Sequence, residues 1–392
     1  MSEMIPLAFF LATAARPVVP GDDTWQHPLP LSRRPQATTH KETVTYGDYF
    51  TAVGDFLEKE HYRAVKEALV DTFGVKADML RVRRLAVFLV KHGEFYHPAR
   101  VVVKYGQGEF SFVVNVAISK TGRDHIKGEF NLLARLFPEF ELPVLPKVYH
   151  QAEIPSGDNT KIPMFSGQWF EGFCEFHITA DHPENMSSLI VWDQDDTRFY
   201  LTKQQAEDVY RQAAFILTNA YNFFTFEQIS AWHHAAGDFI LKSVDTTRVD
   251  LRLITVRNYA PLIENTEPDP AALIEGLLLF FLNLTIRNRL DRLDGTGVLA
   301  WADDYTLKGT INGFFNGLTQ VVRKQDLPQT FPAEFKNYIQ AHSPEALHDL
   351  FSAVVDTIPD TSPEHDFVTK RLGKHVDLFR GLPGSGQPAN QP

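Results

Sequence analysis

At residues 80–119 the spacing of apolar residues changes from that of a helix to that of strands. This change limits the available folds more than any other feature. Three runs rich in β-branched and aromatic residues, RRLAVFLVKHGEF, YHPARVVVKY and EFSFVVNVAIS, follow one another with short polar turns between them. Strands joined by short connections pair antiparallel, because a parallel pair needs a longer crossover. The pattern therefore predicts an antiparallel meander.

Segments with a helical spacing of apolar residues lie on both sides of the meander. Residues 46–72 and 126–137 show this spacing, and each predicts amphipathic helix. Residues 168–178 (QWFEGFCEFHI) alternate and predict one further strand. A small hairpin is expected from 190–192 and 199–201. The rest is mainly helical, with helices expected at 204–224, 270–290, 305–322, 333–341 and 344–355.

This order of elements predicts an α+β protein in which an antiparallel-sheet N-lobe precedes a mainly helical C-lobe. The final residues, GLPGSGQPANQP, have the composition of a flexible tail. We therefore expect four parts: an N-terminal extension of irregular leader and helices at residues 1–78, the N-lobe at 79–178, the C-lobe at 179–375 and the tail at 376–392.

Composition and charge exclude several classes of protein. The chain has 392 residues, of which 44% are hydrophobic and 12% aromatic, and this favours a packed globular protein. A net charge of -11 argues against a nucleic-acid-binding protein. The single cysteine, Cys174, excludes an intramolecular disulfide and a cysteine-rich zinc site. It favours a reducing, cytoplasmic setting.

Two features bear on membranes and export. Residues 5–15 (IPLAFFLATAA) are apolar, but Glu3 stands where a signal peptide has positive charge. We expect this segment to pack on the domain. No stretch reaches the roughly 20 continuous apolar residues of a membrane helix, so no membrane partner is expected.

The stretch Ile229–Tyr259 gathers the polar residues that most favour a functional site. It reads ISAWHHAAGDFILKSVDTTRVDLRLITVRNY, with strand-like runs at 239–241 and 249–254 on either side of a polar turn. A β-hairpin would bring its two ends together. We therefore expect two groups of side chains to lie close together. The hairpin's entrance supplies His233, His234 and Asp238, and its exit supplies Thr255 and Arg257.

The order of elements across residues 80–320 resembles the kinase-like fold, in particular the aminoglycoside and choline phosphotransferase branch. In that fold a lysine on the third strand pairs with a glutamate on the next helix and holds the phosphates. Asn115, in FVVNVAI, stands where the family has its lysine, and Lys120 at the strand's end is a candidate substitute. Glu129, in GEFNLL, stands where the family has its glutamate.

The same resemblance assigns roles in the second half of the chain. Gly237-Asp238-Phe239-Ile240-Leu241 resembles the Gly-Asn-Ile-Leu of the catalytic loop, with Asp238 in place of the metal-binding Asn. Counting back puts His233 at the catalytic Asp. Thr255 takes the place of the last magnesium ligand, and Arg257 beyond it suits a phosphate or carboxylate.

Three functions remain open at this point. The first is an ATP- and magnesium-dependent phosphotransferase that acts on a small molecule, with nucleotide between the lobes against residues 168–178. The second is a pseudokinase that binds a ligand or protein partner without transferring phosphate, because the lysine, base and last magnesium positions are substituted. The third is a metal-dependent hydrolase using His233 and His234, although no HExxH spacing is present.

Structural interpretations compete with these roles. The histidines and Asp238 would brace the hairpin, and Arg257 would pair with a carboxylate on the helix predicted at 270–290. In the charged run 287–304, an ion-pair network at a helix end is expected from Arg289, Asp291, Arg292 and Asp294. The acidic residues 193–196 are expected to form a turn.

Overall fold

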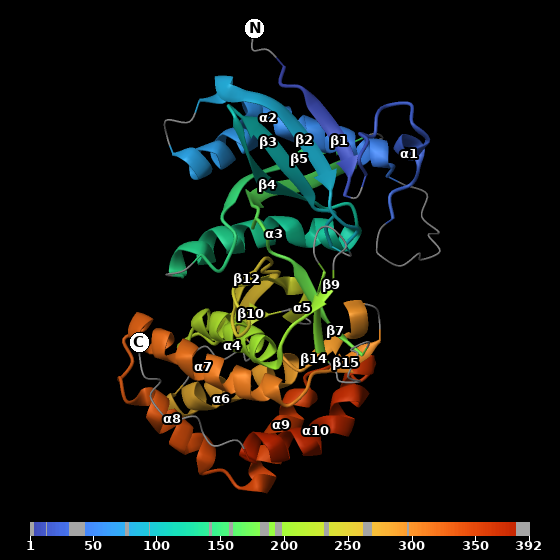
Figure 1. Cartoon of the computed structure of the whole chain (residues 1–392). Coiled ribbons are helices and arrows are strands. Elements are labelled where there is room, and N and C mark those ends of the chain that lie inside the picture. Colours follow the sequence, from blue (N-terminus) through green and yellow to red (C-terminus); the bar gives the residue numbers. More distant parts are fainter. Residues whose placement is uncertain are drawn as a thin grey trace. The chain divides into compact units, whose positions relative to one another are not determined.

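The computed structural model describes most of the chain, and it divides into two compact units (Figure 1). The N-unit comprises Met1–Pro138 and Pro146–Glu171, and the C-unit comprises Glu139–Leu145 and Gly172–Pro392. Each unit is treated by itself. The described residues are 4–12, 14–30, 44–74, 78–93, 95–140, 143–156, 160–180, 188–192, 198–230, 235–261, 269–295 and 298–381.

A six-stranded sheet forms the centre of the N-unit. Its antiparallel core contains the predicted meander, which is confirmed. The strands in spatial order are β1 (Leu7–Leu11), β2 (Val82–Leu89), β3 (Ala99–Tyr105), β4 (Gly108–Val116), β6 (Thr160–Gln168) and β5 (Val148–Ser156). Only the pair β1·β2 is parallel among these described strands. The apolar segment expected to pack on the domain thus supplies an edge strand of the sheet.

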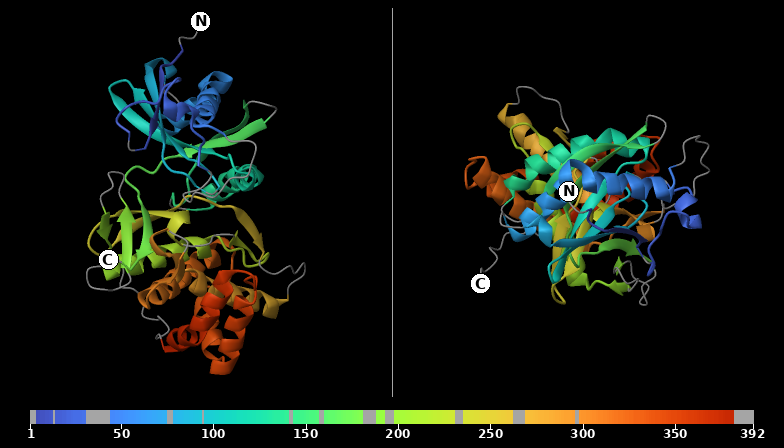
Figure 2. Two further views of the ribbon diagram at one scale, coloured as in Figure 1. Left: turned by 90° about the vertical axis from the view of Figure 1, so that its right-hand side faces the viewer. Right: turned by 90° about the horizontal axis from the view of Figure 1, so that it is seen from above.

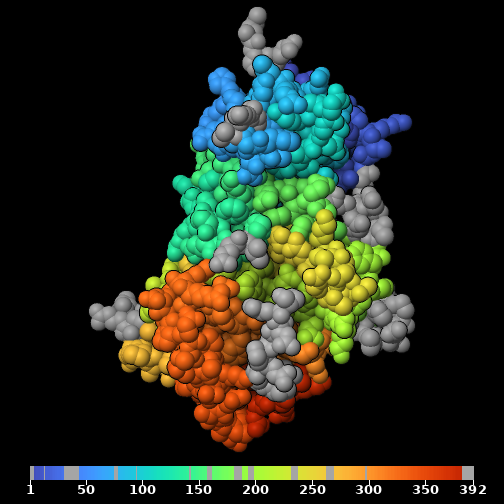
Figure 3. Space-filling model, turned by 60° about the vertical axis from the view of Figure 1, so that its left-hand side comes forward, coloured from blue at the N-terminus to red at the C-terminus, as the bar shows by residue number. Residues whose placement is uncertain are grey.

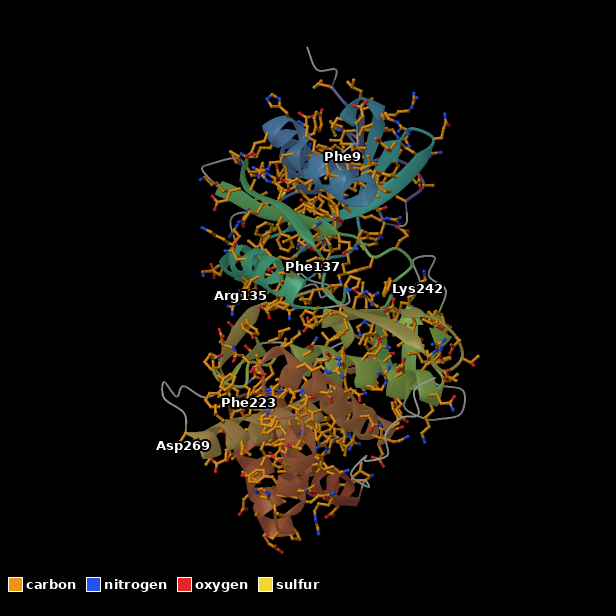
Figure 4. The ribbon with its side chains drawn as sticks, turned by 90° about the vertical axis from the view of Figure 1, so that its left-hand side faces the viewer. Phe9, Arg135, Phe137, Phe223, Lys242 and Asp269 are labelled. Carbon is orange, nitrogen blue, oxygen red and sulfur yellow. The ribbon has the colours of Figure 1, made fainter. Side chains whose placement is uncertain are left out.

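Helix α2 (Tyr46–Phe73) covers one face of this sheet (Figure 2). It begins with a capping box, in which Thr45 and Asp48 satisfy each other's backbone N–H groups. Its buried side pairs Phe50 with Phe9 of β1, the residue labelled in Figure 4, at 5.0 Å between ring centroids. This contact joins the first strand to the helix in one apolar core. The predicted boundary between residues 78 and 79 therefore falls inside the N-unit.

Helix α3 (Lys120–Leu136) covers the opposite face of the sheet. Phe112, Val114 and Val116 of β4 belong to the core under α2. Side chains alternate along a strand, so Asn115 and its cross-strand neighbour Phe165 point the other way. Phe165 meets Phe130 of α3 at 5.9 Å.

The C-unit contains small sheets and a larger set of helices (Figure 1). Its strands are β7 (Glu175–Thr179), β8 (Ser188–Trp192), β9 (Arg198–Tyr200), β10 (Glu227–Ser230), β11 (Phe239–Ser243), β12 (Val249–Leu253), β13 (Asn258–Pro261), β14 (Leu290–Arg292) and β15 (Leu299–Trp301). Its longer helices are α4 (Lys203–Asn219), α6 (Pro270–Arg287), α7 (Tyr305–Lys324), α8 (Phe331–Gln340), α9 (Pro344–Val355) and α10 (Pro363–Gly381). In Figure 3 the segment that includes α7 and α8 forms the orange surface.

Short helical segments complete the two units. They are α1 (Asp23–Gln26) and α5 (Ala235–Asp238), with 3-10 turns at Met79–Arg81, Phe137–Glu139 and Leu293–Gly295. The mixture of helices with a multi-stranded sheet confirms the α+β class. The small hairpin expected at 190–192 and 199–201 is confirmed by the pairing of β8 with β9.

Two elements differ from their predicted limits. The single strand expected at 168–178 is wrong: β6 ends at Gln168, and β7 starts at Glu175 in another sheet. The chain turns between them at Gly172, whose positive φ of 76° breaks an extended run. At the other end, α10 reaches Gly381 and so extends into the range predicted as a flexible tail.

Helix α6 confirms the helix predicted at 270–290, and much of it is buried. Asp269, labelled in Figure 4, caps it by accepting a hydrogen bond from the Ala272 N–H at 2.8 Å. Phe281 stacks on Phe314 of α7 with ring centroids 4.0 Å apart. By length and composition α6 could cross a membrane, but half of its apolar window is buried inside the fold. Core helices pass the same test.

Helices α4 and α7 pack with their backbones in close approach. Gly309, Gly313 and Gly317 recur every four residues along α7 and so share one face. A side chain at Gly309 or Gly313 would overlap the α4 backbone at the carbonyls of Glu207 and Arg211. The stripe of glycines is therefore a packing requirement of the C-unit.

We expect Gly313→Ala to lower the free energy of unfolding by roughly 1–3 kcal/mol, because the added methyl group forces the two helices apart. Gly373→Ala on α10 is the matched control, since no atom lies within 4 Å of the added group. Alanine should leave that helix as stable or slightly more stable. Chemical denaturation of both variants measures the difference, and equal stabilities would contradict this packing.

Candidate functional site

The hairpin predicted within Ile229–Tyr259 is present in the C-unit. Strands β11 and β12 pair antiparallel, with Phe239 opposite Leu253. Its turn is built on Asp245, whose carboxylate accepts hydrogen bonds from the side chain and backbone of Thr247 and from Arg248. These bonds, first that from the Thr247 hydroxyl, hold the pKa of Asp245 well below its usual range.

The two ends of the hairpin meet as the sequence predicts. The Ile254 N–H donates to the Asp238 carbonyl at 2.9 Å and holds the exit beside the entrance. Arg257 then reaches back, and its Nη2 donates to Asp238 Oδ1 at 2.6 Å. Their side chains are only 13% and 5% exposed, so this ion pair is removed from solvent. The structural interpretation of Arg257 predicts a carboxylate partner on the helix at 270–290. Its partner in the structure is Asp238 instead.

This region of the C-unit also holds buried oxygens without partners. Asp238 Oδ2, Thr255 Oγ1 and Asp291 Oδ2 are buried, and they have no hydrogen-bond partner within the described ranges. Buried polar atoms are rarely left this way unless water, an ion or a ligand serves them. We call Asp238, Thr255, Arg257 and Asp291 the hairpin-mouth cluster.

Asp291 is the member of this cluster that the sequence did not predict. It lies on β14, and its carboxylate accepts the N–H groups of Arg292, at 2.7 Å, and Ile178. The pKa of Asp291 is raised to about 8, first by complete burial and also by the nearby Asp238 charge, although these hydrogen bonds lower it. At neutral pH Asp291 therefore keeps its proton.

The ion pairs expected within the run 287–304 are wrong, because its arginines pair with other residues. Helix α6 ends at Arg287, and the next residues form a strand, so i,i+3 neighbours no longer share a face. Arg289 instead bonds Asp304 at 3.0 Å, and Arg292 bonds Glu364 at 2.9 Å. The misassigned helix end explains why Asp291 was missed.

The candidate residues of the N-unit occupy α3 and the strand before it. Glu129 is 1% exposed, and its Oε2 accepts a hydrogen bond from the Tyr96 hydroxyl at 2.5 Å. Asn115 lies on the sheet face that α3 covers, as its pairing with Phe165 requires. Lys120 begins α3 with its side chain 85% exposed and bonds Asp124 at 2.6 Å.

These placements divide the candidate residues between the two units. Asn115, Lys120 and Glu129 belong to the N-unit, and Asp238, Thr255 and Arg257 belong to the C-unit. His233, His234 and the acidic residues 193–196 lie outside the described residues, so their predicted roles stay predictions. Among the side chains that the structure describes, no group of three His, Cys, Asp or Glu residues could hold a metal ion.

Comparison with known proteins gives no further assignment: no family model matches the chain, and no curated protein matches it.

We expect Arg257→Gln to lower the free energy of unfolding by roughly 3–5 kcal/mol, because it leaves the buried Asp238 carboxylate without its counter-charge. Arg248→Gln on the same hairpin is the control. Its pair with Asp245 is 69% and 39% exposed, and such pairs contribute roughly 0–1 kcal/mol. Urea unfolding of both variants gives the comparison. Losses of similar size would show that the buried pair is no more important than the exposed one.

Asp291→Asn should remove a pH dependence of stability. An unfolded Asp ionises near about 3.9, whereas the folded group titrates at about 8. Between these values the unfolded chain releases a proton that the folded chain retains, so wild-type stability falls as pH rises from about 4 to 8. Unfolding at several pH values should show the variant gaining on the wild type across this window. Asp349→Asn, at an exposed site on α9, is the control. If the difference in unfolding free energy between variant and wild type did not change with pH, the raised pKa of Asp291 would be contradicted.

Proposed function

We propose that this chain is a non-catalytic protein of the kinase-like type, a pseudokinase that binds a ligand or partner without transferring phosphate. The observation that carries the proposal is the buried ion pair between Asp238 and Arg257. In the kinase-like resemblance Asp238 occupies the position of a magnesium ligand. Here its charge is already balanced by a guanidinium built into the chain.

The chemistry of this pair opposes magnesium binding. Mg²⁺ demands a near-ideal octahedron of oxygen ligands at roughly 2.0–2.1 Å. An arginine already held at 2.6 Å from Asp238 Oδ1 would have to move away first and leave its own charge partly buried. Thr255, at the family's last magnesium position, offers a neutral hydroxyl in place of a carboxylate. A fixed cation thus takes the electrostatic role that the metal ion has in an active kinase.

The N-unit supports the same proposal independently. In an active kinase the glutamate of the helix after the third strand pairs with the strand's lysine. Glu129 occupies such a helix, and a neutral tyrosine hydroxyl, that of Tyr96, donates to it. Asn115, at the lysine position, carries no charge. The family's lysine position is therefore uncharged in this chain, and its glutamate position accepts a hydrogen bond from a tyrosine.

The other expectation, an ATP-dependent phosphotransferase acting on a small molecule, differs from this proposal in one measurable property. It requires ATP and Mg²⁺ as cofactors and Asp238 as a metal ligand. The site of the nucleotide, expected between the lobes, stays a prediction, and so does the cytoplasmic location.

We expect ATP to bind the wild-type chain equally well, or equally poorly, with Mg²⁺ and with EDTA, because Arg257 already balances the charge of Asp238. Calorimetry under both conditions measures this ratio, and a radiolabelled ATP assay measures transfer. Asp238→Asn serves as a variant that keeps the shape and the hydrogen bond to Arg257. Magnesium-dependent phosphate transfer that disappears in this variant would overturn the proposal and favour the phosphotransferase.

A further inference from the structure

A second polar feature of the C-unit lies outside the hairpin-mouth cluster. It is a cavity of about 200 Å³ lined by Arg289, Trp301, Lys370, Arg371, Lys374 and His375. We call it the basic cavity. The helix α10 supplies its longer wall, because positions 370, 371, 374 and 375 recur on one helical face. Arg289 and Trp301 come from the segment around β14 and β15.

Positive charge dominates the lining. Arg289 is 4% exposed and donates two hydrogen bonds to the Ala302 carbonyl as well as one to Asp304. Its guanidinium also lies 5.1 Å from the centre of the Trp301 ring. Burial lowers the pKa of Arg289, although the hydrogen bond to Asp304 opposes this shift. An anion in the cavity would stabilise the buried charge.

The two lysines lack counter-ions of their own. Lys370 and Lys374 are exposed, and they make no ion pair or hydrogen bond within the part of the chain that the structure describes. The acidic residues one turn away on α10, Asp366 and Asp377, do not pair with them there. Asp303 interacts electrostatically with Lys374 and Arg289. The four basic residues of the lining outnumber Asp303 and Asp304, so the local charge stays positive in a chain of net charge -11.

His375 adds an unsatisfied acceptor to this lining. The Thr285 hydroxyl donates its only proton to the Leu282 carbonyl at 2.7 Å, so it must accept the hydrogen bond that it shares with His375 Nε2 at 3.1 Å. Nε2 therefore carries the hydrogen. Burial lowers the pKa of His375 to about 3, so the ring is neutral. Its Nδ1 is then a bare acceptor, buried without a partner among the described residues.

We propose that the basic cavity binds a compact oxyanion of the phosphate class, held by Lys370, Lys374 and Arg289. Lysine and arginine are the usual cationic partners of phosphate oxygens. The volume of about 200 Å³ is below the roughly 300–1,000 Å³ of sites for drug-sized ligands. The cavity therefore suits a phosphate group rather than a whole nucleotide.

The unpaired Nδ1 acceptor of His375 distinguishes between oxyanions with and without a hydrogen atom. At neutral pH inorganic phosphate carries at least one P–O–H group, whereas sulfate carries no hydrogen. A hydroxyl that donates to Nδ1 satisfies the buried acceptor, and a ligand without hydrogen leaves it unsatisfied. The cavity should therefore prefer phosphate over sulfate, although the two ions are alike in shape.

Calorimetry on the full chain in chloride buffer tests this site with inorganic phosphate and, separately, sulfate as probes. We expect phosphate to bind and the double variant Lys370→Gln, Lys374→Gln to raise its dissociation constant at least about tenfold. The control is Lys127→Gln, Lys161→Gln, which removes two exposed lysines of the N-unit and should bind phosphate as the wild type does. Both pairs lie at the surface, so circular dichroism should show unchanged folding.

Absence of heat with ~10 mM phosphate would overturn the site, and so would equal affinity in the wild type and the cavity double variant. Sulfate binding as tight as phosphate binding would overturn the assignment of a hydrogen-bearing ligand. None of these outcomes depends on the proposed function, because no residue of the basic cavity belongs to the hairpin-mouth cluster.

Discussion

The buried ion pair of Asp238 and Arg257 is the interaction on which the account of the C-unit depends. A carboxylate this far from solvent is stable only with a counter-charge, and the hairpin supplies one from its own exit. The backbone bond between Ile254 and Asp238 holds the two ends in register. Because the cation is covalently part of the fold, the site keeps its charge balance without a metal ion.

The same principle explains the contrast between the two polar regions of the C-unit. In the hairpin-mouth cluster the charges are matched internally, and the remaining acid, Asp291, is neutralised by its own proton. In the basic cavity the charges are not matched, since the basic residues of the lining outnumber Asp303 and Asp304. A region with balanced charge needs no ligand for stability, whereas a region with excess charge favours one. The two regions therefore suit different functions.

The sequence predicted the hairpin and the proximity of Asp238 and Arg257, because strand patterns and short turns determine register locally. It did not predict that the two side chains bond each other, since that depends on packing around both. It also assigned residues 287–294 to a helix end, although Leu290–Arg292 is a strand, and so overlooked Asp291. The basic cavity was missed because its walls come from segments about 70 residues apart in sequence, Arg289–Trp301 and Lys370–His375.

We propose that the guanidinium of Arg257 stands where a kinase-like protein has its metal ion. Electron paramagnetic resonance of Mn²⁺ in the presence of ATP tests it most directly, because Mn²⁺ replaces Mg²⁺ at oxygen ligands and its spectrum broadens on binding protein. The account predicts that the wild-type chain leaves the Mn²⁺–ATP spectrum unchanged. Broadening by the wild type that is lost in Asp238→Ala would show that Asp238 binds the metal and would contradict the account.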